Sequence, residues 1–410
     1  MNNKNKDKSS KSAFSRKKKI QLTRAASRAV RDGHPWIFRN GIANRDINHK
    51  AGDIVALHDE DSYYLATGYF EEEGAIAFRI LTRNKHLDIN EEFVKKAVFN
   101  AVTLRKELLI QNTNAYRIIN GESDGLPGLT VTVFGDYLLA VQYTPSIDWI
   151  VKIALPELAA MLDAKSVFLQ KRFRPSGDND FNIDRAEKFW GEDFPLDFKI
   201  NEDGCKYLVD LSAPMGVGFF PDFREGRRLI RKLAPGRKMV NMFSHTGAFS
   251  VSALSAGATR VVNIDNSGRY MEILRRNYRN NNLDIDNSDD FITEDVFRGV
   301  ELLRKRESSF DLAVVDPPTF SRGKKTNWSV QKSYTGLLNN MRYIMEPGAY
   351  LLLAINSFKI SMEDFERLIA KSMPGRSMRI LRRIYLPEDY PDLPFFSEGS
   401  YLKSVLIRLD

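Results

Sequence analysis

The last 170 or so residues alternate two kinds of hydrophobic pattern. Apolar runs at 238–243, 260–265, 311–316 and 349–356 are separated by runs with helical spacing at 247–256, 269–281 and 334–345. Strand and helix patterns that alternate in this way predict βαβ units, and therefore a parallel sheet with helices on both faces. Ligands of such sheets bind in the crevice at the carboxyl ends of the strands. We predict an α/β domain over residues 193–410.

Two different patterns precede this domain. The stretch "AGDIVALHDEDSYYLATGYFEEEGAIAFRIL" alternates apolar and polar positions between glycine or acidic turns, as short antiparallel strands do. It predicts a small β-barrel within residues 21–92. From about Glu92 the spacing becomes helical, followed by a hairpin in "LTVTVFGDYLLAVQY", a second helical run and a strand in "SVFLQKRF". Residues 93–192 are therefore predicted to form a central α+β module.

Charge is concentrated at the N-terminus. Residues 1–20 contain eight lysines and arginines against one aspartate, a net charge of +7, while the whole chain of 410 residues carries +8. We predict that this segment is a disordered tail, which either holds a polyanion such as RNA or only improves solubility. It has no apolar core like that of a secretory signal, and no run approaches the about 18 apolar residues of a membrane span. We predict a cytoplasmic protein without membrane contact.

Metal and disulfide chemistry are disfavoured. The single cysteine, Cys205, excludes a disulfide within the chain and a thiolate cluster. The five histidines show no ligand spacing such as HExxH, so we predict no metal site.

The turn after the first strand of the α/β domain indicates the cofactor. It reads "SHTGAF", with one glycine, whereas a dinucleotide requires GxGxxG to pass its pyrophosphate. S-adenosylmethionine has no phosphate and is compatible with this looser turn. Asp265 ends the second strand and could bind the ribose hydroxyls, and Asp295 could accept from the adenine amine. Each aspartate alone has a structural explanation, but Asp265, Asp295 and Asp316 follow three strands in order, which favours a class I methyltransferase.

A stiff turn, "VVDPPTFS" at 314–321, follows the third strand. Its prolines could simply end the strand, because proline cannot donate a ladder hydrogen bond. Alternatively, the turn forms the wall between the methyl donor and a target base. In that hypothesis Phe320 offers a face on which an extruded base stacks, and Asp316 and Pro317 offer oxygens to the amine edge of the base.

The chain resembles the large-subunit (23S) ribosomal RNA methyltransferases that join an N-terminal PUA domain, a central α+β domain and a C-terminal Rossmann-like class I methyltransferase domain. The similarity rests on "GHPWIF", "ESDGLPGLTV", "GVGFFPDFREGRR", "NMFSHTGAFSV", "DPPTFS" and "SEGSYLK". It implies S-adenosylmethionine as cofactor and ribosomal RNA as partner, either as free RNA or in an assembly intermediate, and leaves a homodimer open. It also implies a set of cofactor-binding residues: Phe220, Asp222 and Arg224 beside the cofactor, and Ser244, Thr246, Asp265, Asp295 and Asp316 around it.

One departure from this family bears on the target atom. Members that make 5-methylcytosine carry a cysteine in the segment that reads "LLLAINSFKI" here, and this segment has none. Cytosine C5 becomes nucleophilic only after a thiolate adds at C6. "DPPTFS" and the asparagine of this segment are more similar to the related domain that makes 7-methylguanine, and guanine N7 needs no enzyme nucleophile. We predict methylation of guanine N7. The alternatives are cytosine C5, a non-catalytic ribosome-assembly factor, and an NAD enzyme that the missing glycines disfavour.

Overall fold

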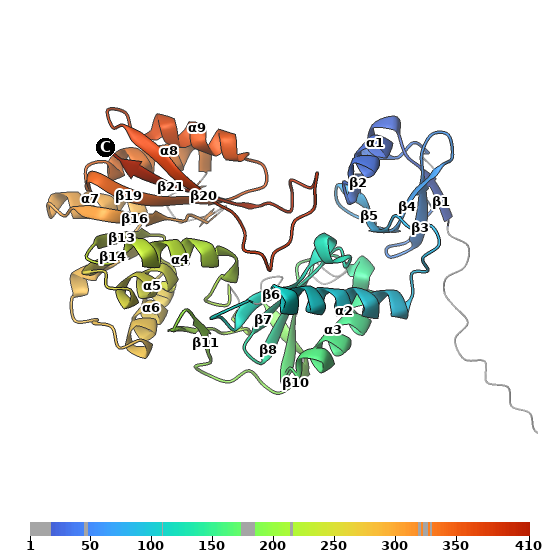
Figure 1. Cartoon of the computed structure of the whole chain (residues 1–410), viewed down its shortest axis with the longest axis horizontal. Helices are drawn as coiled ribbons and strands as arrows, with labels where there is room; N and C mark the ends of the chain where they lie inside the picture. Colours follow the sequence, from blue (N-terminus) through green and yellow to red (C-terminus); the bar gives the residue numbers. More distant parts are fainter. Residues whose placement is uncertain are drawn as a thin grey trace, which may run out of the picture.

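The computed structural model describes residues 18–44, 48–108, 110–173, 185–213, 216–318, 321–322, 327–328 and 330–410. Their helices and strands gather into an N-terminal sheet, a central module and a large C-terminal sheet with helices (Figure 1).

The N-terminal unit is a five-stranded sheet. Its strands are β1 (Lys18–Gln21), β2 (Trp36–Phe38), β3 (Ile54–His58), β4 (Tyr64–Phe70) and β5 (Ile76–Thr82), in the order β1-β3-β4-β5-β2. A bridge between Leu22 and Ile42 links the segments that follow the two edge strands, which closes the sheet partly, as expected for a small barrel. Strand β1 begins inside the segment predicted to be a disordered tail, so that prediction was too long by three residues; residues 1–17 lie outside the described part.

Helix α1 (Arg24–Asp32) packs against the N-terminal sheet and ends at a glycine. Gly33 has φ 115°, and its amide donates to the carbonyls of the last turn, so a residue without a side chain is favoured there. The short 3₁₀ turn η1 (Arg39–Gly41) follows β2. The helix therefore ends directly before "HPW".

The central module is a second five-stranded sheet. Its strands are β6 (Ala115–Asn120), β7 (Leu129–Phe134), β8 (Tyr137–Gln142), β9 (Ser166–Lys171) and β10 (Ala186–Gly191), in the order β10-β9-β8-β7-β6. Helices α2 (Glu91–Glu107) and α3 (Asp148–Leu162) pack on one another and share one apolar core with the sheet. The predicted hairpin in this module is the pair β7 and β8. Short turns η2 (Gly121–Asp124) and η3 (Pro145–Ile147) complete it.

A short hairpin and a helix lead into the C-terminal sheet. The hairpin is β11 (Lys199–Glu202) with β12 (Cys205–Leu208), and the turn η4 (Pro221–Phe223) runs directly into α4 (Arg224–Leu233).

The C-terminal sheet has seven strands in the order β15-β14-β13-β16-β19-β21-β20. The predicted strands are β13 (Lys238–Met242), β14 (Arg260–Asp265), β16 (Phe310–Val315) and β19 (Met345–Asn356). They pair in parallel, β14 with β13, β13 with β16 and β16 with β19. Strands β15 (Phe291–Thr293), β20 (Met378–Ile384) and β21 (Leu402–Leu409) complete the sheet. The predicted parallel sheet is present in β13, β14, β16 and β19, and β21 adds an antiparallel strand that pairs with both β19 and β20.

Helices cover both faces of this sheet (Figure 1). On one face lie α4, α5 (Ala248–Ser255) and α6 (Gly268–Asn280); on the other lie α7 (Val296–Lys305), α8 (Val330–Met341) and α9 (Met362–Ser372). Neighbouring residues of one strand, such as Met239 and Val240, enter different cores, which explains why these strands are continuous apolar runs. In the described part of the chain, no helix is long and apolar enough to cross a bilayer.

Candidate active site

The loop after β13 is the first part of the site. Phe243 and His245 both have positive φ, at 56° and 50°, and Gly247 follows at 81°. Positive φ is costly for bulky residues and persists mainly at functional sites, where the surroundings enforce it. A side chain at Gly247 would meet Leu274 Cγ at 2.5 Å, so α6 packs closely against this loop. Between the two strained residues, Ser244 is 4% exposed, and its hydroxyl has no hydrogen-bond partner among the described residues.

Asp265 lies beside this loop at the end of β14. One carboxylate oxygen accepts from the His245 amide at 2.9 Å, and the other accepts from the Ser267 amide at 2.9 Å. Burial raises the pKa of Asp265, and these two hydrogen bonds oppose the rise. Each carboxylate oxygen can accept a further hydrogen bond. Asp265 therefore fixes the strained loop and retains acceptors for a pair of hydroxyl groups.

We expect Asp265→Ala to raise the dissociation constant for S-adenosylmethionine by about 5- to 150-fold, corresponding to about 1–3 kcal/mol for a lost buried hydrogen-bond partner. Isothermal titration calorimetry measures this directly. Asp286→Ala, which changes an exposed carboxylate on the loop after α6, is the matched control and should bind normally. Equal affinity in wild type and Asp265→Ala would contradict the proposed ribose contact.

An aromatic layer borders the loop. The His245 ring lies 4.2 Å from the Tyr270 ring and 5.2 Å from the Phe220 ring, measured between centroids. Burial lowers the pKa of His245 to about 4, so the imidazole is neutral at physiological pH. Phe220 is 53% exposed, and its free face is available to a ligand. Sequence reasoning missed His245 and Tyr270, although Tyr270 stands in the first turn of the helix that follows Asp265.

Two carboxyl groups, those of Asp222 and Asp316, interact through their charges. Burial and the negative charge of Asp222 raise the pKa of Asp316 to about 7, and Arg227 opposes the rise. Burial also raises the pKa of Asp222, against a hydrogen bond from the Tyr401 hydroxyl at 2.8 Å. Asp316 follows β16 directly and so stands at the carboxyl end of a central strand, while Asp222 lies in the turn η4.

Arg227 only partly neutralises this pair. Its guanidinium makes a two-pronged ion pair with Glu202, with distances of 2.5 and 2.9 Å, and donates to the Phe220 carbonyl at 2.9 Å. Both partners of the ion pair are almost fully buried. The three carboxyl groups of Glu202, Asp222 and Asp316 therefore have two neighbouring guanidinium groups, since Arg117 also acts on Asp222. The remaining negative charge favours a cationic ligand or a base that becomes cationic.

The remaining predicted residues have other contacts. Arg224 makes a buried ion pair with Asp389 and donates to the Ala115 carbonyl, instead of facing the Asp222 and Asp316 pair. Thr246 donates its hydroxyl to the Gly218 carbonyl. Asp295 caps α7, where its carboxylate accepts from the Phe297 amide at 3.0 Å.

The "DPPTFS" turn is described only as far as its prolines. Pro317 is buried and Pro318 is exposed. Phe320 lies outside the described residues, so its stacking role stays a prediction.

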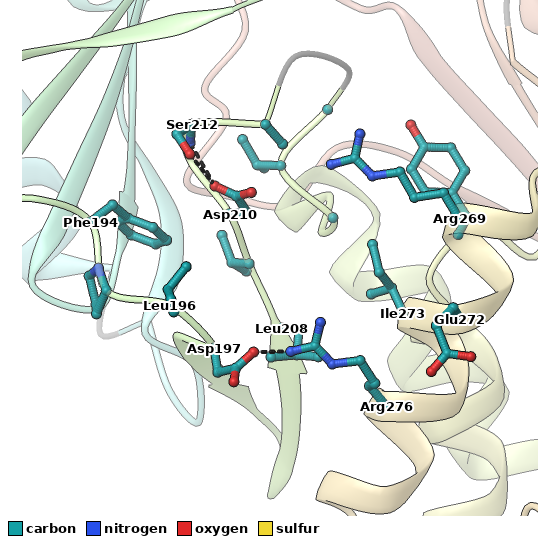
Figure 2. A pocket seen from close by; sticks show the side chains of 17 residues that line it. Phe194, Leu196, Asp197, Leu208, Asp210, Ser212, Arg269, Glu272, Ile273 and Arg276 are labelled. Carbon is teal, nitrogen blue, oxygen red and sulfur yellow. Dashed lines mark hydrogen bonds and ion pairs between the residues drawn. The ribbon is translucent and has the colours of Figure 1, made fainter.

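A cavity of about 460 Å³ adjoins the cofactor loop (Figure 2). It lies between the segment before β11, the segment after β12 and helix α6, and Arg276 closes one side by pairing with Asp197. Asp210 accepts two hydrogen bonds from Ser212 within it. Asp265 and Asp316 do not line this cavity, so it is distinct from the predicted cofactor site, which it meets only at Tyr270 and Gly218.

The residues around the loop after β13 fit S-adenosylmethionine. The unpaired Ser244 hydroxyl and the spare acceptors of Asp265 suit its polar groups, the Phe220 face suits its adenine, and the carboxyl groups suit its sulfonium charge. The site contains no cradle of glycine amides that a pyrophosphate would require.

Comparison with known proteins gives the same cofactor. Residues 150–408 match the S-adenosylmethionine-dependent methyltransferase family, and residues 20–83 match a PUA-like domain. The chain is 33% identical to the putative ribosomal RNA large subunit methyltransferase YwbD of Bacillus subtilis, with coverage of 95% of this chain and 99% of YwbD. It is 29% identical to ribosomal RNA large subunit methyltransferase I of Aeromonas salmonicida, with coverage of 95% and 98%.

Solved structures share the fold across all three units. A putative S-adenosylmethionine-dependent methyltransferase from Streptococcus mutans superposes with a TM-score of 0.84 at 23% identity, covering 95% of this chain and all of its own. A putative methyltransferase complexed with SAH superposes with a TM-score of 0.87 at the same identity and coverage. The chain therefore belongs to the S-adenosylmethionine-dependent methyltransferase family and joins the methyltransferase fold to a PUA-like domain.

Proposed function

We propose that the protein transfers a methyl group from S-adenosylmethionine to N7 of a guanine in large-subunit ribosomal RNA. The observation that carries this proposal is the charge interaction between Asp316, at the end of β16, and Asp222, in the turn η4, in a chain whose one thiol lies elsewhere. The choice of ribosomal RNA is supported by relatives that are named large-subunit ribosomal RNA methyltransferases over nearly the whole chain.

The carboxyl pair suits the charge that develops on guanine. S-adenosylmethionine supplies an electrophilic methyl group, and a guanine methylated at N7 carries a positive charge on its ring. An ionised Asp316, with Asp222 beside it, stabilises that charge as it forms. Its carboxylate and the neighbouring Pro317 carbonyl also offer acceptors to the N–H groups of the guanine edge, which orients N7 for attack. No proton leaves the base, so no general base is required.

Thiol catalysis is disfavoured by the position of Cys205. It lies on β12, is 1% exposed, and accepts a hydrogen bond from Arg231 at 3.2 Å. Arg231 also bonds to the Ser252 carbonyl near the end of α5, whereas the cofactor loop leads into the start of α5. A cytosine C5 mechanism would need this thiol at C6 of the base, next to the methyl donor.

Replacement of Cys205 tests the choice of base. We expect Cys205→Ala to keep turnover within about threefold of wild type, because the guanine lone pair attacks the methyl group without an enzyme nucleophile. The assay is methyl transfer to 23S RNA, both protein-free and in pre-ribosomal particles from cells that lack the protein. Borohydride and aniline cleave RNA at 7-methylguanosine and leave 5-methylcytidine intact, so cleavage followed by mass spectrometry identifies the product.

The contrary outcome is equally specific. Loss of activity in a folded Cys205→Ala protein, together with a modified cytosine that resists cleavage, would replace guanine N7 with cytosine C5. Circular dichroism and S-adenosylmethionine affinity serve as controls for folding. Absence of transfer to either RNA sample by wild type would contradict the ribosomal RNA substrate itself.

A further inference from the structure

We propose that Tyr401 is a positioning residue for methyl transfer and that it holds Asp222 in place. Tyr401 lies at the end of a connection that contacts all three units of the protein. This inference rests on the proposed function, because it assigns a role to Asp222 in that reaction. The connection comprises residues 385–401, between β20 and β21, and is called the β20–β21 connection below.

The direct contact is a single hydrogen bond. The Tyr401 hydroxyl donates to Asp222 Oδ2 at 2.8 Å, across 179 residues of sequence. Asp222 acts on Asp316 through its charge, so the orientation and ionisation of Asp222 affect the group proposed to face the base. Tyr401 itself is directed at Asp222, so it acts on the base only through this carboxylate.

The backbone around Tyr401 is fixed at the same edge of the sheet. The Ser357 amide donates to the Tyr401 carbonyl at 2.8 Å. The buried Lys403 ammonium donates to the carbonyls of Ser357 and Ser400, at 2.9 and 2.6 Å. These contacts join the segment after β19 to the start of β21, so hydrogen bonds hold the backbone from which the Tyr401 side chain extends.

The central module anchors the middle of the β20–β21 connection. Asp389 is 1% exposed, pairs with Arg224, and accepts from the Arg117 amide at 2.8 Å. Its carbonyl accepts from Arg105 at 3.1 Å. Asn120 donates to the Pro391 carbonyl at 2.9 Å. The connection is therefore bonded to α2, to β6 and the residue that ends it, and to α4.

The PUA-like unit anchors the far end of the connection. The Phe396 ring packs on the Trp36 ring with centroids 4.8 Å apart, and on the His34 ring at 5.7 Å. His34 Nε2 lies 3.4 Å from Glu398 Oε2. Figure 1 shows the connection leaving β20, descending to β6 and reaching toward the N-terminal sheet before it returns to β21. A shift of the PUA-like unit would thus be transmitted to Tyr401 along residues 397–401.

The charged groups around Asp222 allow the role of Tyr401 to be measured through the pH dependence of the reaction. The groups that face it come from four elements: Tyr390 and Tyr401 on the β20–β21 connection, Arg117 on β6, Arg227 on α4 and Asp316 after β16. The Tyr401 hydrogen bond and the two arginines favour the ionised form of Asp222, while burial and Asp316 disfavour it. Removal of the Tyr401 hydroxyl should therefore raise the pKa of Asp222 further.

The first test compares Tyr401→Phe with wild type in methyl transfer to 23S RNA between pH 5.5 and 9. We expect kcat at pH 7 to fall about tenfold because Asp222 is no longer held in place, and KM for RNA to stay within twofold. The acid limb of the kcat profile follows Asp316 and should move to lower pH, because a less charged Asp222 raises the pKa of Asp316 less. Tyr385→Phe is the matched control, since its exposed ring starts the same connection, and should behave as wild type. An unshifted acid limb in Tyr401→Phe would refute the proposal, whatever happens to kcat.

The second test needs no RNA, so it separates this inference from the proposed function. Tyr401→Phe should lower the melting temperature at pH 8, and should lower it much less when Asp222→Asn is already present. At pH 5, where Asp222 is more protonated, the difference between the two backgrounds should shrink. Equal shifts in both backgrounds at pH 8 would overturn the inference even if wild type methylates RNA. Failure of wild type to methylate RNA, with the coupling intact, would remove only the proposed function.

Discussion

Asp316→Asn is expected to lower kcat by about a hundredfold or more when both S-adenosylmethionine and RNA are saturating. The amide has nearly the same shape as the carboxylate but lacks the negative charge that stabilises the methylated guanine. Its N–H groups would also face the N–H groups of the guanine edge, and two donors cannot form a hydrogen bond. A base misplaced by about 1 Å can cost roughly a hundredfold in rate. Single-turnover transfer with saturating RNA isolates this step from product release.

The pH dependence of the same variant provides the control. Because the pKa of Asp316 is raised to about 7, wild-type kcat should rise as the pH increases through 7, and Asp316→Asn should lose this titration. A raised carboxyl pKa means that the folded state binds more protons than the unfolded state between about pH 4 and 7, so ionisation of Asp316 costs stability above that range. The Asn variant should therefore be at least as stable as wild type at pH 8. A variant that is inactive because it unfolds, or one that keeps wild-type kcat, would contradict the assigned role.

The sequence predicted the catalytic sheet because its strands are buried on both faces. Continuous apolar runs such as 260–265 and 349–356, placed between helical runs, are typical of parallel strands covered on both faces. Strands β14 and β19 lie at these runs. Strand β21 was not predicted, because an antiparallel strand at the end of a chain has no crossover helix to mark it. Its position between β19 and β20 depends on pairing across the sheet, which local patterns do not contain.

In the site, too, local sequence patterns predicted some residues, while long-range contacts determine others. Asp265, Asp295 and Asp316 each follow a strand, so the rule that ligands bind at strand ends was enough to select them. Arg224 could only be placed by resemblance, and its partner Asp389 is 165 residues away in an irregular segment. Tyr401 and His245 act through long-range contacts with Asp222 and Phe220, and neither contact leaves a periodic signal in the sequence.

Asp389→Ala is expected to be the most destabilising of the substitutions considered. It leaves the buried Arg224 guanidinium without a counter-charge and removes the acceptor of the Arg117 amide. Breaking a buried ion pair by removing one partner costs about 3–5 kcal/mol, because the remaining charge stays desolvated. Urea unfolding followed by tryptophan fluorescence and by far-UV circular dichroism should show the loss, and the two signals report whether the units still unfold together.

Two further variants separate charge burial from simple loss of contact. Arg224→Met with Asp389→Leu removes both charges and should recover much of the stability, since an apolar pair of similar volume avoids the desolvation cost. Glu363→Ala breaks an exposed pair with Arg367 on α9 and should change stability by less than about 1 kcal/mol. If the Met and Leu double variant is stable but its kcat falls and its acid limb shifts as in Tyr401→Phe, the β20–β21 connection needs Asp389 to hold Tyr401 in place. If Asp389→Ala unfolds no more readily than Glu363→Ala, the buried pair does not anchor the connection.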